Sequence, residues 1–354
     1  MDLKKYGFMP HMLPEDAQGI PARVTAVHKG RYGLVCEYGE TYGRLKTKEY
    51  FNGMEEFPTT GDFVMIHYIP GSDSQIIRTL PRATFFSRRD PSPGRGEQAV
   101  ASNFDTVFVM QSLNQDFNMK RMERYLTLAW QSGAVPVIVL TKADLLDGGD
   151  CENREYQKSD YIRTVERFAP GVAVHAVSSR TGAGLGALTG YMAAGRTIVF
   201  LGSSGVGKSS LVNALAGEEV MAVNAIREED GKGRHTTTHR QLILLKNGAM
   251  VIDTPGMREL GMWDVSDGLG EAFTDVERFL GRCRFSDCRH QTEPGCAVRE
   301  AIENGELSQE RWESYIKLKK EAKFTDNKEA FLRHKQQRNK SISKYNRQNN
   351  KIRF

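Results

Sequence analysis

The stretch from Thr197 to Leu215, TIVFLGSSGVGKSSLVNAL, constrains the fold of this chain more than any other. An apolar, largely β-branched run leads into a glycine-spaced loop, and apolar residues then recur at helical spacing. The stretch therefore predicts a strand, a loop and a helix in direct succession. The loop itself has the pattern G-x-x-x-x-G-K-[ST], which is the phosphate-binding P-loop.

The residue types in this loop suit phosphate binding. Glycines let the backbone curl so that its N–H groups point inward at a phosphate, at the positive end of the following helix. Lys208 can reach the β- and γ-phosphate oxygens, and the Ser209 hydroxyl can ligate Mg²⁺. The alternative, a plain glycine-rich turn, is disfavoured by the flanking strand and helix. The nucleotide-binding residues expected here are Gly202, Ser203, Ser204, Gly205, Val206, Gly207, Lys208, Ser209 and Ser210.

A second motif, TKAD, follows the predicted buried strand Val135 to Leu140. In guanine-nucleotide-binding proteins the corresponding carboxylate, here Asp144, accepts hydrogen bonds from N1–H and N2–H₂ of guanine, a donor pair that adenine lacks. Lys142 would lay its stem over the base plane, and Thr141 stands where Asn is commoner. By itself the string is short, and a strand-to-helix cap is the alternative interpretation.

A third strand, Val172 to Val177, ends in Ser178 and Ser179. This ending resembles the loop that presents a backbone N–H to guanine O6. The two serines alone carry almost no information. Their position after the TKAD strand is the reason to include them in the expected nucleotide site.

Two segments downstream of the P-loop match the nucleotide-sensing loops of guanine-nucleotide-binding proteins. Gly233 to Thr238, GRHTTT, lies in a charged stretch, and Thr237 there can close on Mg²⁺ and the γ-phosphate. The strand Met250 to Ile252 leads into DTPG, in which Asp253 can hold Mg²⁺ through water and the Gly256 N–H can sense the γ-phosphate. Together the motifs are far more specific than any one of them.

A cysteine and histidine cluster lies nearer the C-terminus, with the spacing Cys283-x₄-Cys288-x-His290-x₅-Cys296. Three thiolates and an imidazole satisfy a closed, tetrahedral, structural Zn²⁺ site. Free thiols brought together by coincidence are the alternative. A helix from about Ser308 to Lys323 should complete the small domain that the metal stabilises.

The N-terminal region, about residues 20 to 80, reads as a small β-barrel, for which we choose an OB-like fold. Short alternating apolar runs separated by glycines predict four or five strands there. Rings that can stack on bases are mixed with cations that can bind phosphate, which suggests RNA binding, although a plain solvated barrel face would look much the same. The mixed residues are Arg23, His28, Lys29, Arg31, Tyr32, Tyr42, Arg44, Lys46, Lys48, Tyr50 and Phe51.

Length and charge complete the description. A chain of 354 residues suggests two or three domains, and the polar segment from Ser87 to Glu97 is typical of a linker. Residues 308–354 contain 14 Lys and Arg against 5 Asp and Glu, which indicates a polyanionic partner unless the tail only solubilises the chain. No long apolar run or signal-peptide pattern appears, so we expect a cytoplasmic monomer that does not enter membranes.

The order of the motifs is unusual. A common small GTPase begins with the P-loop and ends with the TKAD-type and serine loops, whereas here the last two come first, so the domain is circularly permuted. This order, with a barrel in front and a Cys/His cluster behind, resembles the ribosome small-subunit-dependent GTPase A family (RsgA, also YjeQ or YloQ). The expected architecture is an OB-fold barrel with its linker (1–95), a circularly permuted α/β P-loop GTPase domain (96–263), a mainly α zinc domain (264–325) and a basic tail (326–354).

The resemblance implies a GTP hydrolase that acts late in the assembly of the small (30S) ribosomal subunit. GTP would hold the state that binds the subunit, and hydrolysis to GDP would release it. The barrel, the zinc domain and the tail would contact 16S rRNA. One zinc ion and a Mg²⁺ ion bound with GTP are the implied cofactors, with Ser209, Thr237 and Asp253 around the magnesium.

The expected catalytic residues depart from the ordinary mechanism. Met257 follows DTPG, where many GTPases carry the Gln that orients the attacking water, so intrinsic hydrolysis should be slow. The resemblance implies that a switch-loop histidine takes over, and His235 matches that position beside Lys208 and Gly256. A solvated loop histidine is the alternative for His235.

Two other classes of function stay open. One is a nucleotide-gated RNA-binding scaffold in which hydrolysis is vestigial. The other is a metabolic P-loop enzyme such as a kinase, against which TKAD and DTPG argue.

Overall fold

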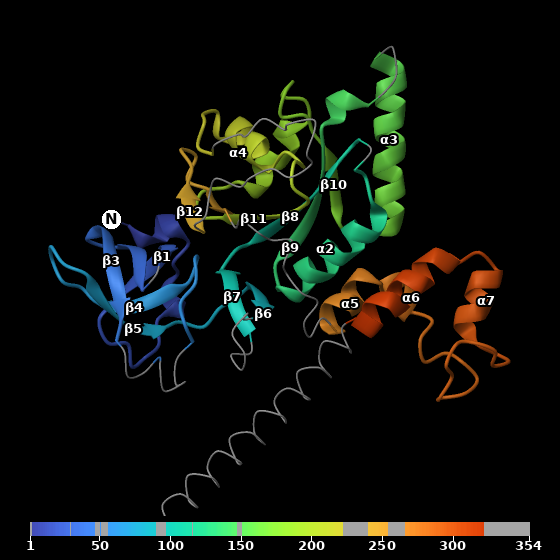
Figure 1. Ribbon diagram of the computed structural model, residues 1–354, viewed down its shortest axis with the longest axis horizontal. Coiled ribbons are helices and arrows are strands. Elements are labelled where there is room, and N and C mark those ends of the chain that lie inside the picture. Colours follow the sequence, from blue (N-terminus) through green and yellow to red (C-terminus); the bar gives the residue numbers. More distant parts are fainter. Residues whose placement is uncertain are drawn as a thin grey trace, which may run out of the picture. The chain divides into compact units, whose positions relative to one another are not determined.

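The computed structural model describes residues 2–28, 30–46, 50, 56–89, 97–114, 116–146, 151–221, 240–253 and 266–321. The chain divides into two compact units, Met1–Ser87 with Ala99–Leu260, and Arg88–Gln98 with Gly261–Phe354. The first unit holds a barrel and a larger sheet, and the second holds the helices beyond residue 265 (Figure 1). Among the helices of these described ranges, none has the length and apolar content needed to cross a membrane.

Five N-terminal strands close into a barrel, because β1 pairs with β2 on one side and with β4 on the other. The order around the barrel is β1-β2-β3-β5-β4, with β3 and β5 parallel. Apolar side chains from alternate positions fill its interior, including Val24, Leu34, Val64, Ile66 and Ile76. The predicted small β-barrel is thus confirmed. Its elements are η1 (Leu3–Tyr6), η2 (Pro10–Met12), β1 (Ile20–His28), β2 (Arg31–Cys36), β3 (Gly39–Leu45), β4 (Phe63–His67) and β5 (Ser74–Thr79).

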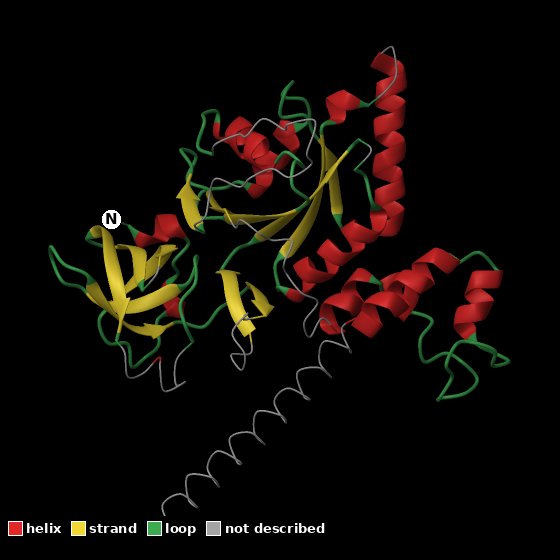
Figure 2. Cartoon of the chain, viewed as in Figure 1, coloured by secondary structure: helices red, strands yellow, loops and turns green. Residues whose placement is uncertain are grey.

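The larger sheet has the order β10-β9-β8-β11-β13-β12. Among these described strands, β12 runs antiparallel to β13, and the other neighbouring pairs are parallel. β8 and β11 are buried along their whole length, as expected of strands covered on both faces, and helices flank the sheet in Figure 2. The strands are β8 (Thr106–Ser112), β9 (Val135–Thr141), β10 (Ala173–Ala176), β11 (Thr197–Leu201), β12 (Gln241–Leu244) and β13 (Met250–Asp253). The helices are α2 (Met119–Gln131), η3 (Ala143–Leu145), α3 (Cys151–Phe168), η4 (Leu185–Tyr191) and α4 (Lys208–Ala216).

The barrel and the larger sheet are joined through β1. Ala26 of β1 pairs with Gln241 of β12. Arg23, also on β1, is almost completely buried and donates to the Asn103 carbonyl oxygen at 2.7 Å and to the Thr197 hydroxyl at 3.0 Å. A barrel residue therefore anchors the start of β11, the strand that leads into the P-loop.

A separate two-stranded sheet consists of β6 (Phe85–Arg89) and β7 (Glu97–Ser102). Ser87 and Glu97, the two ends of the segment expected to be a linker, lie in these strands. Regular structure therefore extends further into this polar segment than its composition indicates, and residues 90–96 lie outside the described ranges.

The second unit is mainly helical in its described part. Residues 309–321 form a helix, as predicted for Ser308 to Lys323 over that range. The Arg311 guanidinium of this helix donates to both carboxylate oxygens of Asp275 at 2.9 Å, and the Tyr315 hydroxyl donates to Glu277 at 2.8 Å. These contacts fix the helix against α6. The other helices are α5 (Ser266–Ala272), α6 (Thr274–Glu277) and α7 (Ala297–Glu303).

Candidate nucleotide-binding site and metal centre

The P-loop lies between β11 and α4, as the sequence predicts. Gly205 and Gly207 have φ angles of 74° and 101°, a backbone conformation that L side chains rarely adopt. Gly202 needs to be small for a different reason, since a Cβ there would lie 3.1 Å from the Met110 carbonyl oxygen. Gly207 caps α4, so Lys208, Ser209 and Ser210 occupy its first turn, where free backbone N–H groups favour an anion.

Asp253 lies at the end of β13, the strand next to β11. The Lys208 ammonium is 2.8 Å from Asp253 Oδ1, and the carboxylate side chain is only 6% exposed. The cation of the P-loop and the carboxylate expected near Mg²⁺ thus share one small region at the edge of the sheet.

The TKAD segment lies beside the P-loop. Thr141, at the end of β9, donates its hydroxyl hydrogen to the Val206 carbonyl oxygen at 2.6 Å. Lys142 has a φ of 59°, so the chain turns sharply before η3 begins. Asp144 accepts a hydrogen bond from the Ser178 hydroxyl at 2.6 Å. The TKAD segment, which is far from the P-loop in sequence, therefore contacts it at the carboxyl edge of the sheet, and the serine loop contacts TKAD there.

The serine loop after β10 is stabilised by its own backbone. Ser178 donates its N–H to the Ala183 carbonyl oxygen, and its own carbonyl accepts from the Gly182 N–H, both at 2.9 Å. Ser178 is 1% exposed, and Ser179 follows it at partial exposure. The loop can therefore hold the Asp144 carboxylate in one orientation.

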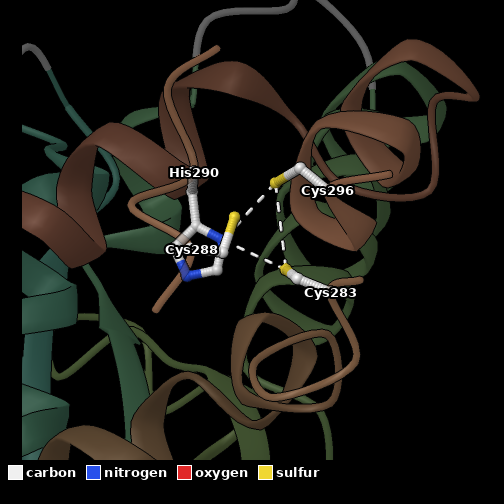
Figure 3. A group of neighbouring side chains, drawn as sticks. All are labelled: Cys283, Cys288, His290 and Cys296. Atoms are coloured by element: carbon white, nitrogen blue, oxygen red, sulfur yellow. Dashed lines mark hydrogen bonds between the residues drawn. The ribbon is translucent and has the colours of Figure 1, made fainter. Parts of the chain in front are cut away.

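The four residues of the Cys/His cluster converge from a loop and the start of α7, as Figure 3 shows. Their ligand atoms all lie within 4.8 Å of one another. Cys283 Sγ is 3.4 Å from His290 Nδ1 and 3.9 Å from Cys296 Sγ. His290 Nδ1 and Cys296 Sγ are 3.4 Å apart. A tetrahedral ion with bonds of about 2.3 Å to sulfur and about 2.0 Å to nitrogen needs separations close to these. The donor set fits a metal ion.

The electrostatics of the cluster also favour a bound cation. Desolvation and the neighbouring sulfur atoms of Cys283 and Cys296 raise the pKa of the Cys288 thiol to about 11. Burial lowers the pKa of His290, which keeps the imidazole neutral and able to donate a lone pair. The three sulfurs therefore do not all ionise near neutral pH unless a cation lies between them.

Comparison with known proteins decides the family. A family profile described as RsgA GTPase matches residues 79–263. A protein of Listeria innocua named small ribosomal subunit biogenesis GTPase RsgA 1 is 42% identical over 349 residues, which are 97% of this chain and 96% of that protein. The chain belongs to the RsgA GTPase family. The resemblance drawn from the motif order is thereby confirmed.

Solved structures agree with the RsgA assignment. YjeQ from Thermotoga maritima has a TM-score of 0.62 and 26% identity, and the match covers 84% of this chain and 96% of that one. YloQ, described as a circularly permuted GTPase, shares the fold with a TM-score of 0.60 and 24% identity over 88% of this chain and 98% of its own. A second profile, described as 50S ribosome-binding GTPase, matches residues 197–341.

Several expected residues of this RsgA chain lie outside the part that the structure describes. His235, Thr237 and Gly256 lie outside the described residues, as does the tail beyond residue 321. The same is true of three members of the mixed basic and aromatic set on the barrel, Lys29, Lys48 and Phe51.

The structure corrects the expected RNA-contacting surface of the barrel. Arg23, Tyr32 and Tyr50 are 1%, 6% and 1% exposed, so they belong to the interior and cannot contact RNA from there. Arg31 and Arg44 stay at the surface, where Arg31 lies 3.7 Å above the Tyr42 ring and both guanidinium groups pair with Asp73. The sequence alone does not separate these buried residues from the exposed ones. Both kinds are polar or aromatic, and alternation along a strand does not say which of its faces is inside the barrel.

Sequence reasoning missed the loop after β8. Asp116 lies in this loop, where the Ser203 hydroxyl of the P-loop donates to its Oδ2 at 2.8 Å, and it is held by Asn114 of the loop and by Gln111 near the end of β8. The sequence offers one indication of this loop. β8 is parallel to the strands that carry the recognised motifs, so the loop that follows it lies at the same edge of the sheet.

Proposed function

We propose that this RsgA chain hydrolyses GTP and acts in the biogenesis of the small ribosomal subunit. One observation carries the first part: Asp144, the P-loop and Asp253 meet at the carboxyl edge of one sheet although the chain supplies them in permuted order. The second part rests on family membership, since the Listeria relative is named for small-subunit biogenesis.

The residues have distinct roles in this proposal. Asp144, steadied by Ser178, accepts the two donors of guanine, and Lys142 covers the base plane. Backbone N–H groups from Ser203 to Ser210 surround the phosphates. Lys208 neutralises the β- and γ-phosphates, and this requires that Lys208 leave its ion pair with Asp253.

Magnesium bound with GTP would neutralise the charge that develops on the phosphates. Ser209, Asp253 and Thr237 are the side chains proposed to hold it, and the Gly256 N–H would donate to the γ-phosphate. Met257 replaces the usual Gln, so His235 is proposed to orient the attacking water. Four ligands fit zinc at the Cys/His cluster, where the ion would stabilise the second unit and leave no position open for substrate.

The proposed partner is the small subunit with its 16S rRNA. Three features support RNA contact: the exposed Arg31, Tyr42 and Arg44 of an OB-like barrel, the metal-centred unit, and the strongly basic residues 308–354. GTP would favour the bound state, and hydrolysis would release a cytoplasmic monomer.

The test is steady-state hydrolysis of GTP and ATP by the purified protein, with and without isolated small subunits. Wild type should hydrolyse GTP slowly and ATP not at all. The rate of GTP hydrolysis should rise strongly when small subunits are added. His235→Ala should lose the stimulated rate, whereas His11→Ala, which changes an exposed histidine of η2, should keep it. Turnover unchanged in His235→Ala would favour the vestigial scaffold, and preference for ATP would revive a metabolic P-loop enzyme.

A further inference from the structure

The loop between β8 and α2 contacts the P-loop at its first variable residue. Asp116 Oδ2 accepts the Ser203 hydroxyl hydrogen at 2.8 Å. The same carboxylate pairs with Arg121 of α2, with Arg121 Nη2 2.9 Å from Oδ2 and Nη1 3.1 Å from Oδ1. Asp116 is therefore oriented by a cation while it holds a P-loop serine.

The backbone of Asp116 is fixed as well. Its carbonyl oxygen accepts from Gln111 Nε2 at 2.9 Å, and Gln111 is 1% exposed. Its N–H donates to Asn114 Oδ1 at 3.1 Å, and that oxygen also accepts from the Ser112 hydroxyl at 2.8 Å. A side chain whose own backbone is held on both sides can place its carboxylate accurately.

The other end of the P-loop is held from β9. The Thr141 hydroxyl donates to the Val206 carbonyl oxygen at 2.6 Å and lies 3.5 Å from the Gln111 carbonyl oxygen. Gln111 thus connects the two supports, one at Ser203 and one at Val206. A loop whose N–H groups must all point at one phosphate gains from being held at two places, because fewer conformations compete with the binding one.

We infer that Asp116, with Arg121 as its partner, is a positioning residue that holds the P-loop in its phosphate-binding conformation through Ser203. The inference rests on the proposed function, because it assumes that the loop binds a guanine nucleotide. It adds a set of residues, from the loop after β8, that none of the recognised motifs contains.

The experiment measures binding of a fluorescent GDP analogue, with unlabelled GDP, GMP and ADP as competitors. Ser203→Ala and Asp116→Ala should each raise the Kd for GDP about three- to tenfold, which is the usual worth of one hydrogen bond. The double variant should bind GDP no more weakly than the weaker of the two single variants, since each single substitution already removes the same contact. The Kd for GMP, which lacks the β-phosphate, should change less than twofold.

Asp116→Asn provides the conservative variant. It keeps an oxygen that can accept from Ser203 and weakens the pairing with Arg121. Its Kd for GDP should therefore lie between the values of wild type and Asp116→Ala. Asp16→Ala is the matched control, because it breaks an exposed ion pair with Arg78 far from the P-loop in sequence and contacts no nucleotide motif. It should bind GDP as wild type does.

The outcomes separate the two claims. Wild type that binds ADP as well as GDP would overturn the proposed function itself. Wild type that prefers GDP, together with Ser203→Ala and Asp116→Ala that match it within twofold, would overturn the inference alone. Equal losses for GDP and GMP would also overturn it, because they would indicate general damage to the site. Ser203→Ala removes one partly exposed oxygen atom, so the test does not depend on Asp116→Ala folding well.

Discussion

Thr141 donates its hydroxyl hydrogen to the Val206 carbonyl oxygen over 2.6 Å. The contact ties the TKAD segment, for which we propose guanine recognition, to the P-loop, and both residues are buried, at 2% and 3% exposure. A threonine can therefore support the P-loop at a position where asparagine is commoner.

Thr141→Val keeps the shape of the side chain and removes this donor. A buried carbonyl without a partner costs about 1–3 kcal/mol, so the urea midpoint of the unit that holds the sheet should fall, and GDP should bind more weakly. Urea unfolding followed by GDP titration measures both. Thr41→Val, which removes a half-buried barrel hydroxyl whose acceptor, the Tyr42 carbonyl oxygen, is 3.5 Å away, should leave both unchanged. A Thr141→Val protein as stable as wild type would show that the contact contributes nothing.

Asp144→Asn should exchange the base preference. An amide offers one acceptor and one donor, whereas guanine presents two donors at N1 and N2, so guanine loses one hydrogen bond and meets an opposing donor. Xanthine carries an oxygen at position 2 and suits the amide. Competition binding should show XDP gaining over GDP by tenfold or more in Asp144→Asn. Ser178→Ala, which removes the 2.6 Å bond to Asp144, should weaken GDP without favouring XDP.

The sequence predicts most of this site because its motifs are local. Strand, loop and helix around Lys208 follow from apolar spacing and glycines, and the strand predicted at Val135 to Leu140 is β9 (Val135–Thr141). The sequence of β3 does not show the apolar alternation of a strand, because Gly43 is its one buried residue. A Cβ at that glycine would lie 2.6 Å from Leu34 Cδ1 and 3.0 Å from Ile76 Cγ1, so a larger residue would have to displace side chains of the barrel interior. Contacts between distant segments, such as Ser203 with Asp116 or Arg23 with Thr197, leave no pattern in the sequence.

Arg23→Met should be strongly destabilising. Burial lowers the pKa of the Arg23 guanidinium to about 10, so it is still charged at neutral pH. It donates to the Gly61, Asn103 and Tyr6 carbonyl oxygens and to the Thr197 hydroxyl, and methionine can donate to none of them. Removing these donors should lower the free energy of unfolding by about 3 kcal/mol or more.

Two variants make the Arg23 measurement decisive. Arg23→Lys keeps the charge but cannot reach four acceptors with one ammonium group, so its loss in urea unfolding should be intermediate. Arg44→Met removes an arginine that is 68% exposed and paired with Asp73, and it should cost less than about 1 kcal/mol. Equal stability of Arg23→Met and Arg44→Met would mean that the buried network does not join the barrel to the sheet energetically.

Removing the metal should loosen the second unit and spare the first. Elemental analysis of the purified protein should find about one zinc per chain, and Cys296→Ser should abolish it, because Cys296 lies within 4 Å of both Cys283 and His290. A chelator should then speed hydrogen exchange across residues 266–321, where α7 begins directly after Cys296 and His290 packs on Trp312. Amides of β8 and β11 should keep their protection.

Cys36→Ala changes a buried barrel thiol outside the cluster and should retain the ion. Zinc retained by Cys296→Ser, or exchange that rises equally in β8 and β11, would contradict a structural metal centre confined to the second unit.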